Sequence, residues 1–301
     1  MTQRRRVLFA GGTAAVLLAG TMASGGAAAG TSVTIADKGF TESFIVTQAY
    51  AQALKAKGYK VKVKSLASTA IADAALRKGS IDLYPDYTTT LLVDVLKSKK
   101  PPKAVVNQVK AIRKGYAKRK LVVLNAAPFN NDNEVACTKA AVDQYKLTTL
   151  SSLAAAAPNL VYSANPEHTK RADGLPLLQS AYGINFKSVI QVDIGLRYKP
   201  VEDGQAQCVY AFGTDPKIAS NKLVVLKDDK GQFQGAAYQG IPVVSAAYLK
   251  TAPVGFRATV NRVSAILTSD AIRAMNAQVD LDKEDPEDVA AAFLKKNGLA
   301  K

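Results

Sequence analysis

The chain has 301 residues, of which 48% are apolar; this fills two core-bearing units of ordinary domain size or one large one and excludes a disordered protein. Its 40 Lys and Arg residues outnumber 24 Asp and Glu residues, for a formal charge of +16. The lysines are spread through amphipathic helices, so we expect a solvated basic surface and no nucleic-acid partner, with attraction to an anionic envelope surface as the alternative.

The first 29 residues are typical of an export signal and are excluded from the fold. Three arginines at 4–6 precede an apolar stretch at 7–22, and alanines at 27–29 offer a cleavage site. A twin-arginine signal and a general secretory signal both fit. No other apolar run approaches the length of a membrane span. We therefore expect an exported protein, either periplasmic or at the cell surface or extracellular.

From residue 32 the pattern alternates strands with helices. Strands are expected at 32–36, 59–66, 81–84 and 121–125, and helices at 41–57, 69–77, 89–96 and 102–118. The helix at 41–57 places Val46, Ala49, Tyr50, Ala53 and Leu54 on one face and ends at Gly58. This β-α-β-α-β order predicts a parallel sheet with helices on its faces.

A second unit begins after the polar turn at 130–133. Its expected strands are 134–138, 160–164, 188–192, 208–212 and 223–226, and its helices are 140–145, 149–157, 175–182, 196–202 and 216–220. Beyond a turn at 228–231 we expect a strand at 241–245 and helices at 260–267, 269–279 and 286–297. The last helical segment has no sheet of its own, so we place it on the first unit.

These elements predict an α/β protein of two lobes with a ligand cleft between them. Lobe I is expected to comprise 30–128 and 236–301, and lobe II 129–235. The chain would cross between them near 126–134 and 227–240, which places a hinge behind the cleft.

The stretch IDLYPDYTTT at 81–90 lies where a buried strand meets a loop. Because Pro85 cannot donate to a ladder, we expect the chain to turn there and present Tyr87 at the strand's carboxyl end, the edge at which open α/β sheets bind ligands. Tyr84 still lies inside the strand and is assigned to the core.

Residues suited to catalysis are few. The single histidine, His168, is expected on the surface, and one histidine cannot form a zinc pair. The sequence has no phosphate-binding G-x-x-x-x-G-K-[ST] loop and no G-x-G-x-x-G motif after a strand. Asp82 and Asp86 have a spacing more typical of turn caps than of metal ligands. We therefore expect no metal, no cofactor and no enzyme; an exported enzyme remains the disfavoured alternative.

Binding has more candidates. Aromatic side chains near strand ends suit a quaternary ammonium, which is held by cation–π attraction of about 0.5–2 kcal/mol per ring. These aromatics are Tyr87, Tyr198, Tyr210 and Phe212. Arg171, just before a helix start, is positioned to clamp a carboxylate bidentately.

The two cysteines, Cys137 and Cys208, both lie in strand-like runs. An exported chain with two cysteines can form one disulfide, which we expect here, with two buried free thiols as the alternative. Neither cysteine is near the signal, so the usual site of lipid attachment is missing.

Five segments carry a resemblance to a known family. KGFTES at 38–43, GSIDLYPDYTTT at 79–90, RADGLPLLQSAYG at 171–183, DIGLRY at 193–198 and AFGTDPKI at 211–218 resemble the substrate-binding proteins of osmoprotectant ABC importers, the glycine betaine/choline/carnitine branch. The resemblance covers nearly the whole mature chain. It implies a type II periplasmic-binding-protein fold of two lobes that closes on its ligand and delivers it to a membrane permease as a monomer.

The resemblance also implies a ligand site. Its residues are Lys38, Phe40, Tyr87 and Thr90 from lobe I and Arg171, Tyr198, Thr214 and Asp215 from lobe II. Tyr210 joins them from the aromatic set. At 130–134, where the family often has an aromatic, this chain has only polar groups, of which Asn131 and Asp132 are candidates. The ligand is expected to be glycine betaine, choline or a similar quaternary ammonium; an amino acid or another small polar solute is the alternative.

Overall fold

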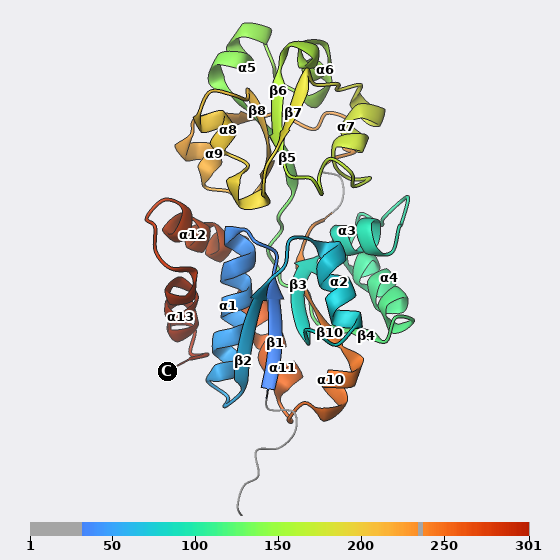
Figure 1. The fold of residues 1–301 in the computed structure, drawn as a ribbon, viewed down its shortest axis with the longest axis vertical. Helices are drawn as coiled ribbons and strands as arrows, with labels where there is room; N and C mark the ends of the chain where they lie inside the picture. Colours follow the sequence, from blue (N-terminus) through green and yellow to red (C-terminus); the bar gives the residue numbers. More distant parts are fainter. Residues whose placement is uncertain (1–31, 234–236, 301) are drawn as a thin grey trace, which may run out of the picture.

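The computed structural model describes residues 32–233 and 237–300, and the expected export signal lies outside this part of the chain. Two five-stranded sheets form the centres of two lobes, stacked along the long axis in Figure 1. We call the lobe of the first sheet lobe I and that of the second lobe II. Within the described residues, no helix is both long and apolar enough to cross a membrane.

Lobe I is built on the strand order β2-β1-β3-β10-β4. Its strands are β1 (Ser32–Asp37), β2 (Lys60–Ser65), β3 (Leu83–Tyr87), β4 (Leu121–Val123) and β10 (Gly240–Ser245). Its helices are α1 (Thr41–Lys55), α2 (Thr69–Arg77), α3 (Thr88–Thr90), the π-helical turn Leu91–Val95, α4 (Val105–Ala117), α10 (Ala246–Thr251), α11 (Phe256–Ile266), α12 (Ser269–Asp280) and α13 (Pro286–Lys296).

Lobe II is built on the order β7-β6-β8-β5-β9. Its strands are β5 (Asn133–Thr138), β6 (Val161–Ala164), β7 (Ser188–Gln191), β8 (Cys208–Phe212) and β9 (Leu223–Val225). Its helices are α5 (Lys139–Tyr145), α6 (Leu150–Ala156), the 3₁₀ turns Ala157–Asn159 and Ile194–Leu196, α7 (Leu175–Tyr182), α8 (Lys199–Glu202) and α9 (Lys217–Ser220).

The sheets are mixed rather than parallel. Strands β2, β1 and β3 are parallel as expected, but β10 runs antiparallel to both β3 and β4. In lobe II, β5 is antiparallel to β8 and β9 in the same way. Each antiparallel strand, β5 or β10, is the first one formed after the chain has crossed from the other lobe. The crossing therefore sets its direction.

The expected turn at Pro85 is wrong, because β3 continues through it to Tyr87. Pro85 lies opposite Pro242 of β10. In the pairs three positions away on either side, Thr88 N–H donates to the carbonyl oxygen of Gln239, and Ser245 N–H donates to that of Asp82. Alternation then makes the proline pair a non-hydrogen-bonded one, in which neither residue needs an N–H toward its partner. Tyr87 still ends the strand.

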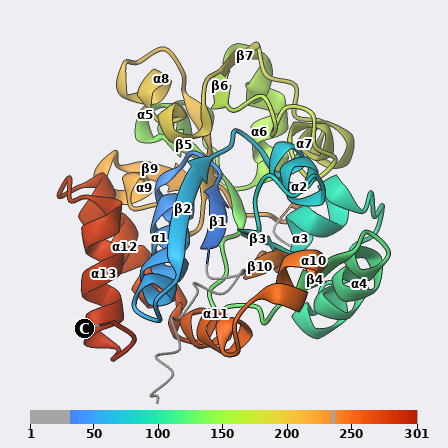
Figure 2. The same ribbon diagram turned by 60° about the horizontal axis from the view of Figure 1, so that its bottom comes forward.

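The C-terminal helices pack on lobe I. Helix α13 packs along α1, and Figures 1 and 2 both show the two side by side with α12 next to them. The predicted apolar face of α1, including Tyr50 and Leu54, is fully buried in this contact and against the sheet. Helix α10 was not predicted.

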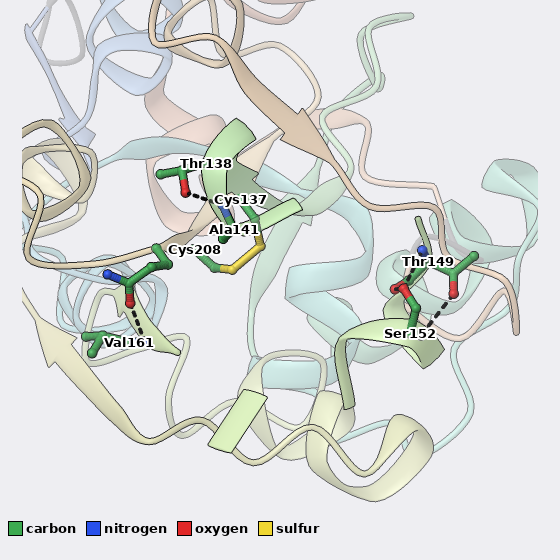
Figure 3. The surroundings of a disulfide bond; sticks show 8 residues. Cys137, Thr138, Ala141, Thr149, Ser152, Val161 and Cys208 are labelled. Carbon is green, nitrogen blue, oxygen red and sulfur yellow. Dashed lines mark hydrogen bonds between the residues drawn. A yellow bond between two sulfur atoms is a disulfide. The ribbon is translucent and has the colours of Figure 1, made fainter. Parts of the chain in front are cut away.

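The predicted disulfide between Cys137 and Cys208 is confirmed. The two residues are opposite one another on β5 and β8, with Cα atoms 4.0 Å apart, and the bond ties the central strand of lobe II, β8, to its neighbour β5 (Figure 3). Both cysteines are fully buried.

Candidate functional site

A cavity lies between the lobes, at the carboxyl ends of β1 and β3 and facing β8. Seven of the eleven residues predicted to bind ligand line it: Lys38, Phe40, Tyr87, Thr90, Asn131, Arg171 and Tyr210. The cavity lining therefore draws on both lobes, which the chain crossings bring together.

Lys38 follows β1 and fixes a positive charge in the cavity wall. Its side chain is 8% exposed, and its Nζ donates to Asp86 Oδ1 at 2.6 Å and to Thr69 Oγ1 at 3.3 Å. The same Nζ lies 4.8 Å from the centre of the Tyr87 ring. Lys38 thus lies over the ring while its charge is balanced by Asp86.

Neither Asp82 nor Asp86 is the turn cap that their spacing predicted. Asp82 accepts the backbone N–H of Thr34 on β1, and Asp86 lies inside β3 as the buried partner of Lys38. The prediction failed because it assumed a turn at Pro85, whereas the strand continues and carries Asp86 into the protein. Tyr84, in contrast, is core as predicted, and its Oη lies 3.5 Å from Tyr116 Oη.

Aromatic rings from both lobes form one side of the cavity. Phe40 of lobe I lies 6.5 Å from Tyr87 and 5.7 Å from Phe212 of lobe II, measured between ring centres. Tyr210 follows, 4.9 Å from Phe212 and edge-on to it. Edge-on and tilted contacts of this kind are favoured between aromatic rings and hold them in place.

Arg171 forms a buried fork with Asp173. Its Nε and Nη2 lie 2.9 and 2.5 Å from the two carboxylate oxygens, and Nη2 also reaches Thr90 Oγ1 of lobe I at 3.3 Å. Burial would raise the pKa of Asp173, but the Arg171 guanidinium outweighs it and holds that pKa below its usual value. Tyr238 donates a further hydrogen bond to Asp173 at 2.9 Å.

His168 is not the surface residue that the sequence predicted. Its ring is 2% exposed, stacks 3.7 Å from the Tyr210 ring and has its Nε2 3.1 Å from Tyr162 Oη. Burial lowers the pKa of His168 to about 3, so the ring is neutral at physiological pH. The loop folds inward because Gly174 lets its backbone approach; a Cβ there would be 2.1 Å from the carbonyl oxygen of His168.

The other four predicted residues lie outside the cavity lining. Asp132 accepts a bond from Asn130 Nδ2 at 2.8 Å. Tyr198 Oη donates to Asp215 at 2.7 Å, and Asp215 also pairs with the buried Arg197. Thr214 is buried and bonds to Glu42 of lobe I. Thr214 thus contacts the other lobe beside the cavity, whereas Tyr198 and Asp215 bond to one another within lobe II.

Several cavity residues were not predicted. They are Asn133, Asn165, Glu167, His168 and Tyr238, with Ala67 and Ile194. Asn133 accepts a hydrogen bond from Tyr210 at 2.6 Å and donates one to Tyr238 at 2.9 Å. Side chains alternate between the two faces of a strand, so Asn133 lies on the same face of β5 as the apolar Val135. This alternation was the sequence signal available for Asn133. Tyr238 lies in the second crossing and had no such periodic signal.

The wall at 130–134 is polar, as the sequence indicated. Asn131 and Asn133 are both buried there, and Phe129, just before them, meets the Tyr87 ring edge-on at 6.3 Å.

Burial raises the pKa of Glu167, against the opposing effect of Arg171. In the described part of the chain no group of His, Cys, Asp and Glu is arranged to hold a metal.

Comparison with known proteins gives a consistent result. Residues 31–296 match the family model described as the substrate binding domain of the ABC-type glycine betaine transport system. A glycine-betaine-binding protein of Pseudomonas aeruginosa is 31% identical over 294 residues, which cover 93% of this chain and 92% of that protein. The ergothioneine transport permease/ergothioneine binding protein EgtU of Helicobacter pylori is 32% identical over 226 residues; these cover 75% of this chain but 40% of that protein.

A solved structure described as a glycine betaine/carnitine/choline ABC transporter has the same fold. It superimposes with a TM-score of 0.67 at 26% identity and covers 89% of this chain and 99% of its own. The predicted two-lobed type II periplasmic-binding-protein fold is therefore confirmed.

Proposed function

Because this chain belongs to the family of substrate-binding domains of ABC-type glycine betaine transport systems, we propose that it captures a quaternary-ammonium zwitterion in the cavity between its lobes. One observation carries the proposal. The cavity is lined by aromatic rings from both lobes and by two cations, Lys38 and Arg171, whose side chains are 8% and 12% exposed. Rings suit the ammonium of a betaine, and cations suit its carboxylate.

The two ends of the ligand take different partners in this proposal. The trimethylammonium lies against Phe40, Tyr87, Phe212 and Tyr210, since it cannot donate hydrogen bonds and is held by ring faces. The carboxylate lies toward Arg171, with the Thr90 hydroxyl as a further donor. Closure of the lobes brings these groups together, and the closed form delivers the ligand to the permease.

The remaining expectations follow from this role. The protein works outside the cytoplasmic membrane with its permease, and we infer that it is exported through the segment at 1–29 and acts as a monomer. We infer no catalytic activity, since the ligand is released unchanged.

Calorimetric titration tests the proposal directly. We expect binding heat with glycine betaine, carnitine or ergothioneine, and affinity for choline at least tenfold weaker than for the best zwitterion. The reason is that choline lacks a carboxylate and would bring a third positive charge toward Lys38 and Arg171. Proline, which lacks methyl groups on nitrogen, is the control solute. Absence of heat with every one of these compounds would overturn the proposal.

Tyr87→Ala is expected to weaken betaine binding at least tenfold, about 1.4 kcal/mol, because it removes one ring of the ammonium site. Tyr87→Phe keeps the ring and should lose less. Tyr145→Ala, on α5 away from the cavity, is the control for loss of a tyrosine. Calorimetric titration of the three variants with betaine measures these affinities. Equal affinities for Tyr87→Ala and the wild-type protein would show that Tyr87 is not part of the ammonium site.

A further inference from the structure

Glu42 lies beside the cavity, where both lobes and helix α12 meet. It is in the first turn of α1 and is 3% exposed. Its Oε1 accepts from Tyr87 Oη at 2.6 Å and from Asn131 Nδ2 at 2.9 Å. Its Oε2 lies 2.5 Å from Thr214 Oγ1 and 3.3 Å from Asn276 Nδ2. None of these four partners is a cation.

The hydrogens available around the carboxyl group of Glu42 determine its protonation state. Thr214 Oγ1 also lies 2.8 Å from Asn131 Oδ1, and the Asn131 amide points its nitrogen at Glu42, so its oxygen can only accept. The single hydroxyl hydrogen of Thr214 therefore goes to Asn131. The 2.5 Å contact between Thr214 and Glu42 Oε2 then needs a hydrogen on Glu42.

With that hydrogen, the three side chains form a closed ring. Glu42 donates to Thr214, Thr214 donates to Asn131, and Asn131 donates back to Glu42. An ionised Glu42 would instead take the hydrogen of Thr214 and leave the buried oxygen of Asn131 facing oxygen lone pairs, which is costly in a buried site.

We propose that Glu42 is a neutral carboxylic acid in the form seen here, in which Thr214 of lobe II contacts Glu42 of lobe I, and that it acts as a positioning residue tying the ligand-facing Tyr87 to Asn131 and Thr214. We call this form, with the lobes in contact, the closed form. This inference rests on the proposed function, because it makes the contact between lobes part of ligand capture. Lobe opening would separate Thr214 from Glu42 and break the ring.

The surroundings favour the neutral form. Burial raises the pKa of Glu42, its hydrogen-bond donors oppose this, and the nearby carboxylate of Asp215 raises it further. The charged groups around the adjoining small cavity are Arg197, Asp215, Lys217 and Asp280. Arg197 is already paired with Asp215, Asp280 accepts a hydrogen bond from Thr41, and Lys217 Nζ lies 5.8 Å from the centre of the Tyr198 ring. None of the hydrogen bonds to Glu42 comes from these charged groups.

The sign of the pH dependence follows. If the pKa of Glu42 is higher in the closed than in the open form, closure takes up a proton between the two values. Affinity is then greatest below the open-form pKa and falls as pH rises, by at most tenfold per pH unit, until it levels off above the closed-form pKa.

The variant Glu42→Gln distinguishes a neutral carboxylic acid that titrates on lobe closure from a residue with a merely structural role. The glutamine amide accepts through its oxygen and donates through its nitrogen, so it reproduces the bonds of the neutral acid to Tyr87, Asn131 and Thr214 but cannot titrate. Glycine betaine is titrated calorimetrically from pH 5.5 to 9 in two buffers of different ionisation enthalpy. We expect proton uptake and falling affinity for the wild-type protein. For Glu42→Gln we expect neither, with an affinity within about threefold of the wild-type maximum.

Two further variants complete the test. Glu42→Ala should lose at least tenfold in affinity at every pH, because Tyr87 and Asn131 lose their common partner. Glu202→Gln, the matched control, changes an exposed glutamate on α8 outside the cavity lining and should keep the Glu42-dependent proton uptake. The inference is overturned if Glu42→Gln takes up protons as the wild-type protein does, or if it binds as weakly as Glu42→Ala.

Thermal unfolding without ligand keeps this test independent of the proposed function. The folded pKa of Glu42 is raised above its ordinary value of 4.5, so its contribution to stability is present at low pH and is lost as pH rises through the folded pKa. Relative to the wild-type protein, Glu42→Gln should therefore melt at progressively higher temperature as pH rises. A difference in Tm that is constant with pH would overturn the inference, whereas missing betaine heat would overturn only the proposed function.

Discussion

Replacing Arg171 with alanine is expected to weaken betaine binding at least a hundredfold, about 2.7 kcal/mol. Arg171 lines the cavity and reaches across to Thr90 of lobe I, so the change removes both a carboxylate partner and a contact between lobes. Truncating one member of a buried, hydrogen-bonded charge pair costs about 2–5 kcal/mol, in part because the other charge is left unpaired. Here that other charge is Asp173, which is 6% exposed.

Lys170→Ala is the matched control, since it removes an exposed cation from the adjacent position in the same loop. Its affinity should stay within about twofold of the wild-type value. The double variant Arg171→Met with Asp173→Asn removes both charges and should unfold at higher denaturant concentration than Arg171→Ala, yet bind no better. If the double variant regains affinity, Arg171 acts through folding alone and does not hold the carboxylate.

Local patterns predicted many elements to the residue. Helices α2 and α7 and strand β8 begin and end where periodicity and capping placed them. Ser68 caps α2 through its side chain, and α7 ends at Gly183, whose φ of +74° is accessible to glycine at little cost. Such signals lie within a few residues of the element that they delimit, so the sequence alone contains them.

Other features depend on distant parts of the chain. The direction of β10 is set by the second crossing between lobes, and no pattern within Gly240–Ser245 encodes it. His168 is buried because its loop folds against Tyr210, 42 positions later, whereas a lone histidine beside charged residues is typical of a surface. Both errors have the same origin: local composition was used where a contact over long sequence separation decides.

The site was predicted unevenly for the same reason. Residues at strand ends, such as Lys38 and Tyr87, follow from sheet geometry and lie in the cavity lining. Glu42 stands in the quoted KGFTES segment but gave no signal of its own, because an acidic residue in the first turn of a helix is ordinary. The role of Glu42 depends on its hydrogen-bond partners Asn131, Thr214 and Asn276, which only the folded chain brings close to it.

Removing the disulfide by changing Cys137 and Cys208 to alanine is expected to destabilise the protein by about 2–4 kcal/mol. The bond joins positions 71 residues apart, and the loss of chain entropy that such a loop imposes on the unfolded state gives about 4 kcal/mol as the upper figure. Alanine is preferred to serine because both positions are fully buried and a hydroxyl there would need a partner. Denaturant titration at equilibrium measures the change.

The control is the wild-type protein treated with a reductant, which should unfold with the same midpoint as the double alanine variant. Equal midpoints for the variant and the untreated wild-type protein would contradict the prediction. Affinity for betaine should change by less than about threefold at 25 °C. The disulfide joins β5 and β8 at one end, while Asn133 and Phe212 pair at the end that faces the ligand. The pair Asn133–Phe212 lies four positions along the β5–β8 ladder from the disulfide. The ladder therefore holds the cavity end in place as long as lobe II is folded.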